Sequence, residues 1–251
     1  MKQMFMLGLI GILAGALPAC RRQPQGDTPP AAGARPKDTL VTATTRLGEK
    51  ANYSWTASTR EAEGGSGPLG SLGPIEGKAE KGGVSYLSFS IGDILVEVYR
   101  DGPKGAAQVL MGGWRTLDEV AGMGGTPATI VRYVRAYQAP AAESAHLAGN
   151  VSDLREADGA FSGELKEDAV KELLLLGTRS RQGKEPQATD AKGSVRFWIK
   201  NGLLAKYEIN VQGKVTEGDR ESTIRRTTTV EIKNAGSTKM AVPPDAREKM
   251  I

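Results

Sequence analysis

The chain has 251 residues, of which 39% are hydrophobic and 25% charged, an ordinary composition for a domain with its own core. The formal net charge of +4 comes from basic and acidic residues that alternate, so no concentrated basic face and no nucleic-acid partner are expected. One cysteine and one histidine are too few for an internal disulfide or a Cys/His zinc site. No metal and no other cofactor are therefore predicted.

Residues 1–19 have the layout of an export signal. Lys2 and the free amino terminus provide a positive start, and residues 4–16 form an apolar run. The run is too short to cross roughly 30 Å of hydrocarbon as a helix. We therefore expect this segment to be removed rather than to remain as a membrane span.

The single cysteine follows this run directly, in the sequence Leu17-Pro18-Ala19-Cys20. This segment resembles the lipobox of bacterial lipoproteins. The resemblance implies cleavage before Cys20, attachment of a diacylglyceryl group to its sulfur, and anchoring on the periplasmic side of the cell envelope. Arg21 rather than Asp follows the cysteine, which favours the outer over the inner membrane. The alternative is an ordinary secretory signal with a chance cysteine at the cleavage site.

Residues 20–38 contain four prolines and almost no large apolar side chain. Such a segment buries too little surface to offset the entropy of ordering it. We expect a lipid-anchored flexible tether over 20–38 and one folded domain over 39–251.

From residue 51 onward the dominant signal is period-two alternation, which predicts strands with one buried face. Asn201-Gly202 lies between two such strands and predicts a tight hairpin, as in an antiparallel sheet. The inward-facing residues are expected to be Tyr53, Trp55 and Ala57; Leu87, Phe89 and Ile91; Ile94, Val96 and Val98; Val195, Phe197 and Ile199; Tyr207, Ile209 and Val211; Val230 and Ile232.

Helical signals occur in the middle of the domain, and helices are expected only there. They comprise a capping box at Thr116–Glu119; an N-cap and proline at Thr126-Pro127, followed by the apolar face of Ile130, Val134 and Tyr137; a helix opened by Pro140 with the stripe Leu147, Val151 and Leu154; and a helix over Leu165–Leu176.

The order of strands, then helices, then strands predicts an α+β fold. Its expected form is a curved antiparallel β-sheet, a half-open barrel, with helices packed on the concave face. Three stretches interrupt the pattern: the glycine-rich residues 60–83, a loop over 177–193, and a charged hairpin tip over 213–226.

Few residues in the sequence are candidates for catalysis. His146 stands alone in an alanine-rich helix, where a surface or packing role is the usual one. The acidic pairs Asp118/Glu119 and Glu167/Asp168 lie at helix starts, where they offset the helix dipole. No catalytic residue is predicted, and an enzyme is not expected.

Two C-terminal stretches carry a family resemblance: residues 193–208 (GSVRFWIKNGLLAKYE), and residues 227–236 (TTTVEIKNAG) with the exit 242–246 (VPPDA). The pattern resembles LolA/LolB-like and LppX/LprG-like lipoproteins. The resemblance implies a half-open barrel whose helices cover the concave face, and a lipid or lipid-modified cargo between helices and sheet.

Two functions remain open. The first is a carrier or receptor for lipid or acylated protein cargo, with Leu69 and Leu72 in a lid. Its cavity is expected to be lined by Trp55, Leu87, Phe89, Phe197, Tyr207 and Ile209. The second is a structural or interaction lipoprotein in which the same six residues simply fill the core. The volume left between sheet and helices distinguishes the two.

Overall fold

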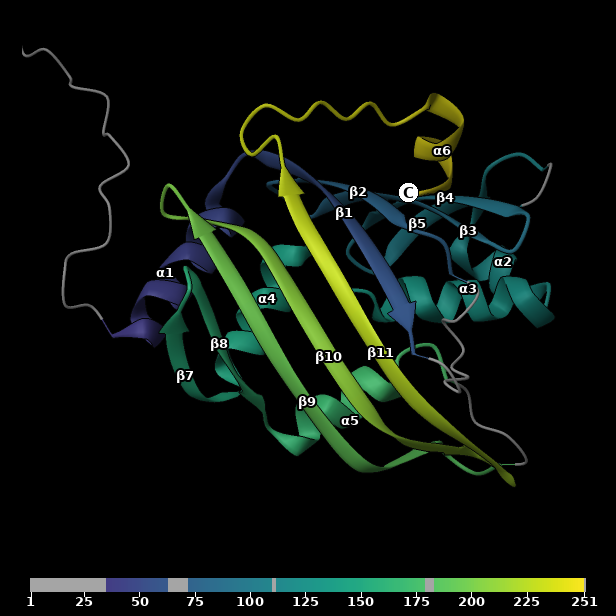
Figure 1. The fold of residues 1–251 in the computed structure, drawn as a ribbon. Helices are drawn as coiled ribbons and strands as arrows, with labels where there is room; N and C mark the ends of the chain where they lie inside the picture. Colours follow the sequence, from purple (N-terminus) through teal and green to yellow (C-terminus); the bar gives the residue numbers. More distant parts are fainter. Residues whose placement is uncertain (1–34, 63–71, 110–111, 179–182, 251) are drawn as a thin grey trace, which may run out of the picture.

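One continuous antiparallel sheet forms the body of the protein (Figure 1). The computed structural model describes residues 35–62, 72–109, 112–178 and 183–250. Within these ranges the sheet has 11 strands in the order β6-β5-β4-β3-β2-β1-β11-β10-β9-β8-β7. Strands consecutive in sequence are therefore neighbours in the sheet, except β6 and β7, and β1 and β11 are the one neighbouring pair among these strands that is not consecutive.

The N-terminal half of the sheet is a meander that runs from the centre of the sheet to one edge. Its alternating residues form strands because one side of each is apolar and the other polar. The bounds are β1 (Asn52–Glu61), β2 (Ile75–Glu80), β3 (Val84–Ile91), β4 (Ile94–Asp101), β5 (Lys104–Val109) and β6 (Arg115–Thr116).

The C-terminal half is a second meander, and β1 pairs with β11 to join the two. Because the edge strands β6 and β7 do not pair, the sheet stays open. The predicted α+β fold with an open antiparallel sheet is confirmed. The bounds are β7 (Val151–Ala157), β8 (Ala160–Leu165), β9 (Gln187–Lys200), β10 (Leu203–Glu217) and β11 (Arg220–Lys233).

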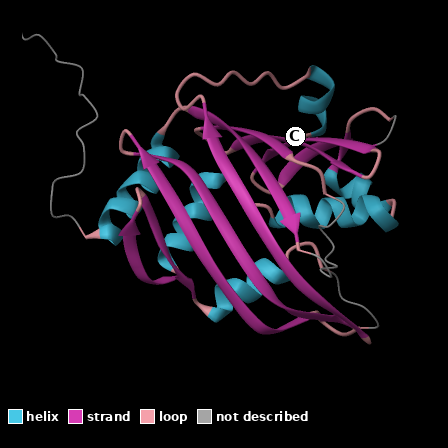
Figure 2. Cartoon of the chain, in the orientation of Figure 1, coloured by secondary structure: helices cyan, strands magenta, loops and turns pink. Residues whose placement is uncertain are grey.

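Five of the described helices pack on one face of the sheet, which we call the inner face (Figure 2). Since β6 and β7 lie at opposite edges, the chain between them must cross the whole sheet, and helices α2 to α4 make this crossing. The bounds are α1 (Pro36–Glu49), α2 (Leu117–Gly122), α3 (Gly125–Ala136), α4 (Pro140–Gly149) and α5 (Glu167–Leu175).

The inner face and these helices enclose the main hydrophobic core. The predicted alternation is confirmed, because Trp55, Phe89, Phe197 and Tyr207 are all nearly fully buried. Each large apolar side chain contributes roughly 1.5–3 kcal/mol through burial, so this face dominates the stability.

Glycines let two large groups approach the inner face closely. Gly77 lies opposite Trp55 in the β1–β2 register, and a Cβ there would overlap the indole ring. Under α5, a Cβ at Gly213 would lie 2.6 Å from Leu174 Cδ1, and one at Gly193 would lie 2.9 Å from Val170 Cγ2. The height of α5 above the sheet thus depends on the absence of side chains beneath it.

The opposite, outer face is covered at one end by α6 (Pro244–Lys249), which Figure 1 shows apart from the other helices. Ala246 of this helix joins Tyr99 and Ala106 in a second small core. Strand β4 also places two apolar residues, Leu95 and Tyr99, on this outer face, and they differ in exposure. Tyr99 is buried by the C-terminal segment, whereas Leu95 stays 60% exposed.

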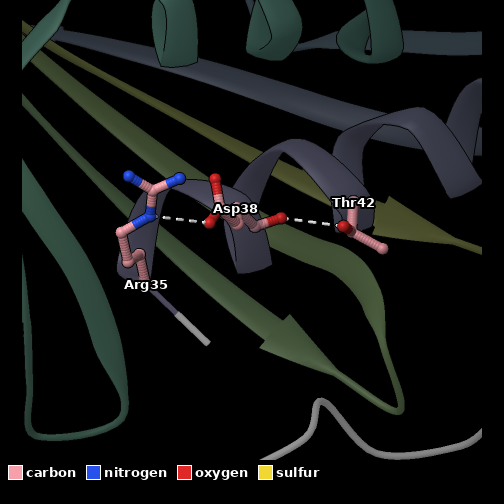
Figure 3. A network of polar contacts seen from close by, with 3 residues as sticks. All are labelled: Arg35, Asp38 and Thr42. Atoms are coloured by element: carbon pink, nitrogen blue, oxygen red, sulfur yellow. Dashed lines mark hydrogen bonds and ion pairs between the residues drawn. The ribbon is translucent and has the colours of Figure 1, made fainter. Parts of the chain in front are cut away.

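The prediction that helices occur only in the middle is wrong at both ends. Helix α1 begins at Pro36, so the last three residues of the predicted tether are helical. Its start is stabilised by proline in the first turn and by Arg35 Nε, 3.0 Å from Asp38 Oδ2 (Figure 3). Thr42 Oγ1 donates to Asp38 O at 2.8 Å in the same turn.

Two further helix predictions need correction. Val151 and Leu154 lie in β7 rather than on a helical stripe, because α4 ends at Gly149 and Asn150 Nδ2 donates to His146 O at 3.0 Å. Helix α3 starts at Gly125, not after Thr126, with Gly124 as its N-cap. The capping box of Thr116 and Glu119 is confirmed.

One predicted hairpin turn is confirmed, and two segments predicted as loops contain paired strand instead. Asn201 and Gly202 form the predicted turn, both with positive φ as a two-residue hairpin requires. The residues expected as a hairpin tip over 213–226 are instead paired strand, because β10 and β11 keep their register down to Glu217 and Arg220. Likewise β9 already begins at Gln187, within the loop expected over 177–193.

Candidate functional site

A cavity of about 560 Å³ lies between α3, α4 and α5 on the inner side of the sheet. Helix α3 ends at Ala136, and residues 137–139 connect it to α4, which Pro140 begins. Amphipathic spacing turns the apolar faces of these helices toward the sheet. The space that remains among their side chains forms the cavity.

The walls of this first cavity are mainly apolar. The side chains come from the end of α3, from α4, and from α5 with the turn after it. The apolar residues are Ala136, Tyr137, Leu147, Ala169, Leu173, Leu175 and Leu176. Polar groups lie among them, namely Arg132, Gln138, Glu143, His146, Glu172 and Thr178. At the rim, His146 Nε2 lies 3.1 Å from Glu172 Oε2 and links α4 to α5.

Glu143 projects from α4 toward the sheet and accepts a hydrogen bond from the Tyr207 hydroxyl of β10. Burial raises the pKa of Glu143 to about 6, and the Tyr207 hydrogen bond and the positive charge of Arg226 offset part of this effect. Around neutral pH this carboxyl is therefore mostly charged, although it is enclosed.

Arg226 is a buried cation on the inner face of β11, with 5% of its surface exposed. It donates to Leu173 O near the end of α5, while its Nη1 has no hydrogen-bond partner in the described part of the chain. Burial lowers the pKa of Arg226 below its ordinary value, and the arginine remains charged. Arg226 thus ties α5 to the sheet and offsets the charge of Glu143.

Tyr137 separates the first cavity from a second one. Trp55 Nε1 donates to the Tyr137 hydroxyl at 2.9 Å, and Ala141 N donates to the Tyr53 hydroxyl at 3.3 Å. Burial raises the pKa of Tyr137 well above 10, so its hydroxyl stays neutral. These hydrogen bonds fix the connection between α3 and α4 against β1.

The second cavity, of about 480 Å³, lies on the other side of this connection. It is bounded by the end of α1, by the β2–β3 turn and by residues 135–142, and Tyr53, Trp55 and Leu87 contribute to its lining. Residues 136–138 line both cavities.

The six residues predicted to line a cavity are all buried. Trp55 and Leu87 line the second cavity. Phe89, Phe197, Tyr207 and Ile209 belong to the main core and are not among the residues that line either cavity. Contact of any of the six with a ligand stays a prediction.

Of the two predicted lid residues, Leu72 forms an isolated bridge with Ile91 and packs against the core. Leu69 lies outside the described residues, as do Leu17, Pro18, Ala19 and Cys20.

Sequence reasoning missed the polar residues of the interior, although two of them leave a signal. Glu143 is four residues before the buried Leu147, on the inward side of α4. Arg226 falls two residues after Ile224 in β11, a position that period two assigns to the inner face. A charged residue at a position predicted to be buried is the signal for such a site.

Other kinds of site receive no support from the described residues. They contain no cluster of three or more His, Cys, Asp or Glu side chains that could hold a metal ion. No helix among them is both long and apolar enough to cross a membrane.

Comparison with known proteins gives similarity to solved structures only. The chain matches no protein-family model and no curated protein. The crystal structure of LprF from Mycobacterium bovis has 11% sequence identity and a TM-score of 0.45, with 84% of this chain and 97% of that chain covered. The Mycobacterium tuberculosis lipoprotein LppX has 11% identity and a TM-score of 0.47, with 82% and 98% covered. LppX is among the lipoproteins that the sequence pattern resembles, and at this identity the similarity concerns the fold.

Proposed function

We propose that this chain is a lipid-anchored carrier or receptor of the cell envelope that holds an acyl chain in the first cavity. The observation that carries the proposal is a mainly apolar cavity of about 560 Å³ between helices α3, α4 and α5. This volume falls within the roughly 300–1,000 Å³ typical of small-molecule sites.

The chemistry of the walls suits an acyl chain. Leucine and alanine side chains from α4 and α5 supply apolar contacts, whereas the wall carboxylates Glu143 and Glu172 are engaged with Tyr207 and His146. Burying about ten methylene groups contributes roughly 8 kcal/mol before the cost of association. A dissociation constant in the micromolar range or weaker is therefore expected.

The anchor is the second part of the proposal. Residues 1–19 act as a lipoprotein signal peptide, Cys20 carries the diacylglyceryl group, and the linker up to α1 places the domain on the periplasmic side. The lipobox and the absence of any other cysteine in the chain support this assignment. The residue after Cys20 favours the outer membrane. Attachment by several acyl chains is stable, unlike attachment by a single myristoyl chain.

A substitution that fills the first cavity tests whether the acyl chain binds there. Ala169 of α5 is buried and lines the cavity, so Ala169→Phe places an aromatic ring in the space proposed for the acyl chain. In the full chain carrying Cys20→Ala, we expect this change to weaken binding of a fluorescent fatty acid at least tenfold.

The matched control is Ala145→Phe, which adds the same ring on the exposed side of α4. It should leave binding unchanged. Equal binding by all three proteins would place the fatty acid elsewhere, and absence of binding by the unfilled protein would reject the carrier function.

A further inference from the structure

The two cavities on either side of the α3–α4 connection differ in charge. The charged residues that line the first cavity are Arg132, Glu143 and Glu172, with His146 cationic only when protonated. The first cavity therefore has no excess of positive charge at neutral pH.

The second cavity, by contrast, carries four cationic residues and one carboxylate: Lys50, Lys81, Arg100, Arg135 and Glu80. The charge of its lining favours an anion. Its aromatic and aliphatic lining residues can contact an apolar group next to this anion.

Two of these cations have partners within the protein. Arg100 donates to the carbonyl oxygens of Val134 and, at 3.0 Å, of Tyr137, so it caps the end of α3. Arg135 Nη2 lies 2.6 Å from Asp118 Oδ1. Both residues serve to position the α3–α4 connection, although Arg100 keeps an unneutralised charge at the cavity.

The two lysines of the second cavity differ from these arginines in their contacts with the protein. Among the described residues, neither Lys50 nor Lys81 forms an ion pair or a side-chain hydrogen bond. They nevertheless stand on adjoining backbone, because Lys81 N donates to Ala51 O at 2.8 Å. This hydrogen bond holds the end of β2 beside the residue that follows Lys50. Two free ammonium groups are thus available on one side of the cavity.

We propose that the second cavity is a binding subsite for an anionic group, a phosphate or a carboxylate, that Lys50 and Lys81 hold. This inference rests on the proposed function in one respect: the anion is the polar end of the ligand whose acyl chain occupies the first cavity. Residues 136–138 line both cavities, so the two sites lie on either side of one short segment, and the proposed ligand crosses over this segment.

The test compares two lipids with the same acyl chain and different charge. The full chain carrying Cys20→Ala is titrated with palmitoyl lysophosphatidic acid and with monopalmitoylglycerol, and inorganic phosphate alone is the third probe. We expect the anionic lipid to bind about tenfold more tightly than the neutral one, the scale of a partly exposed charge interaction. The preference should decrease with added salt, because exposed charges are screened.

Replacing both lysines, as Lys50→Gln with Lys81→Gln, should abolish the preference and leave binding of the neutral lipid unchanged. The control pair Lys104→Gln with Lys239→Gln removes the same charge from exposed positions outside both cavities. It should retain the preference.

The outcomes separate the two proposals. Equal affinities for the two lipids, or equal effects of the two lysine pairs, overturn the anionic subsite while the acyl cavity stands. Phosphate that binds as tightly as the anionic lipid shows a site for the free ion and overturns the link to the acyl chain. If neither lipid binds but phosphate binds through the two lysines, the carrier function fails and the anion site remains.

Discussion

Glu143 makes the stability of the fold depend on pH in a calculable way. Its pKa rises from an ordinary value of 4.5 to about 6 in the folded protein because the carboxyl is enclosed between α4 and Tyr207. Between these two values the folded state binds the proton more tightly than the unfolded chain, so stability decreases as pH rises. The contribution of this group falls by about 2 kcal/mol from pH 4 to pH 7.

The perturbation that isolates this effect is Glu143→Gln. The amide keeps the size of the side chain and accepts the Tyr207 hydroxyl, but it does not titrate. The free energy of unfolding is measured by urea denaturation at several pH values in the Cys20→Ala background. Other titrating groups affect both proteins alike and cancel in the difference. Relative to the unsubstituted protein, the Glu143→Gln variant should gain about 2 kcal/mol between pH 4 and pH 7.

Glu172→Gln is the matched control, since it removes an exposed carboxyl from the same cavity. A stability difference between the unsubstituted protein and the Glu143→Gln variant that stays constant with pH would refute the reasoning. A difference of opposite sign would show that attraction to Arg226 outweighs burial and that the pKa of Glu143 lies below 4.5 in the folded protein.

Two other variants test the account of the fold and the anchor. Gly77→Ala should destabilise the protein by about 2 kcal/mol or more, because the methyl group displaces Trp55 from Tyr137. Gly113→Ala, with open space around its Cβ, should be neutral in the same denaturation experiment, and equal costs would contradict the packing described for Trp55. Cys20→Ala should release the protein from the membrane fraction and abolish labelling with a fatty-acid analogue, and persistent labelling would refute the anchor.

Local pattern in the sequence predicts much of the sheet. Alternation identifies the inward residues of strands such as β1 and β10, and Asn201-Gly202 identifies the hairpin that connects β9 to β10. These features succeed because side-chain direction and turn conformation depend on near neighbours. The fold class follows from the same signals.

The pairing of strands that are far apart in the sequence cannot be predicted from such local patterns. The pairing of β1 with β11 joins residues as distant as Ser54 and Lys233, and no local pattern specifies it. Helix α1 was missed because its threonines weaken the helical signal, although Leu40, Ala43, Thr44 and Leu47 form a buried stripe.

The cavities are harder still to predict, because they are the space that packing leaves unfilled. Their size depends on the height of the helices above the sheet, which Gly193 and Gly213 set beneath α5. It also depends on the Trp55–Tyr137 hydrogen bond, which connects residues far apart in the sequence. The period-two pattern identifies the buried face but not which of its residues border a cavity.

Native mass spectrometry of the Cys20→Ala protein tests the central claim most directly. The protein is purified from a bacterial host without detergent, then measured before and after incubation with palmitoyl lysophosphatidic acid and monopalmitoylglycerol. We expect a bound species with the mass of an acyl lipid, present in the Ala145→Phe protein and absent from the Ala169→Phe protein. A protein that carries no lipid under any of these conditions would contradict the carrier function and favour a structural or interaction lipoprotein.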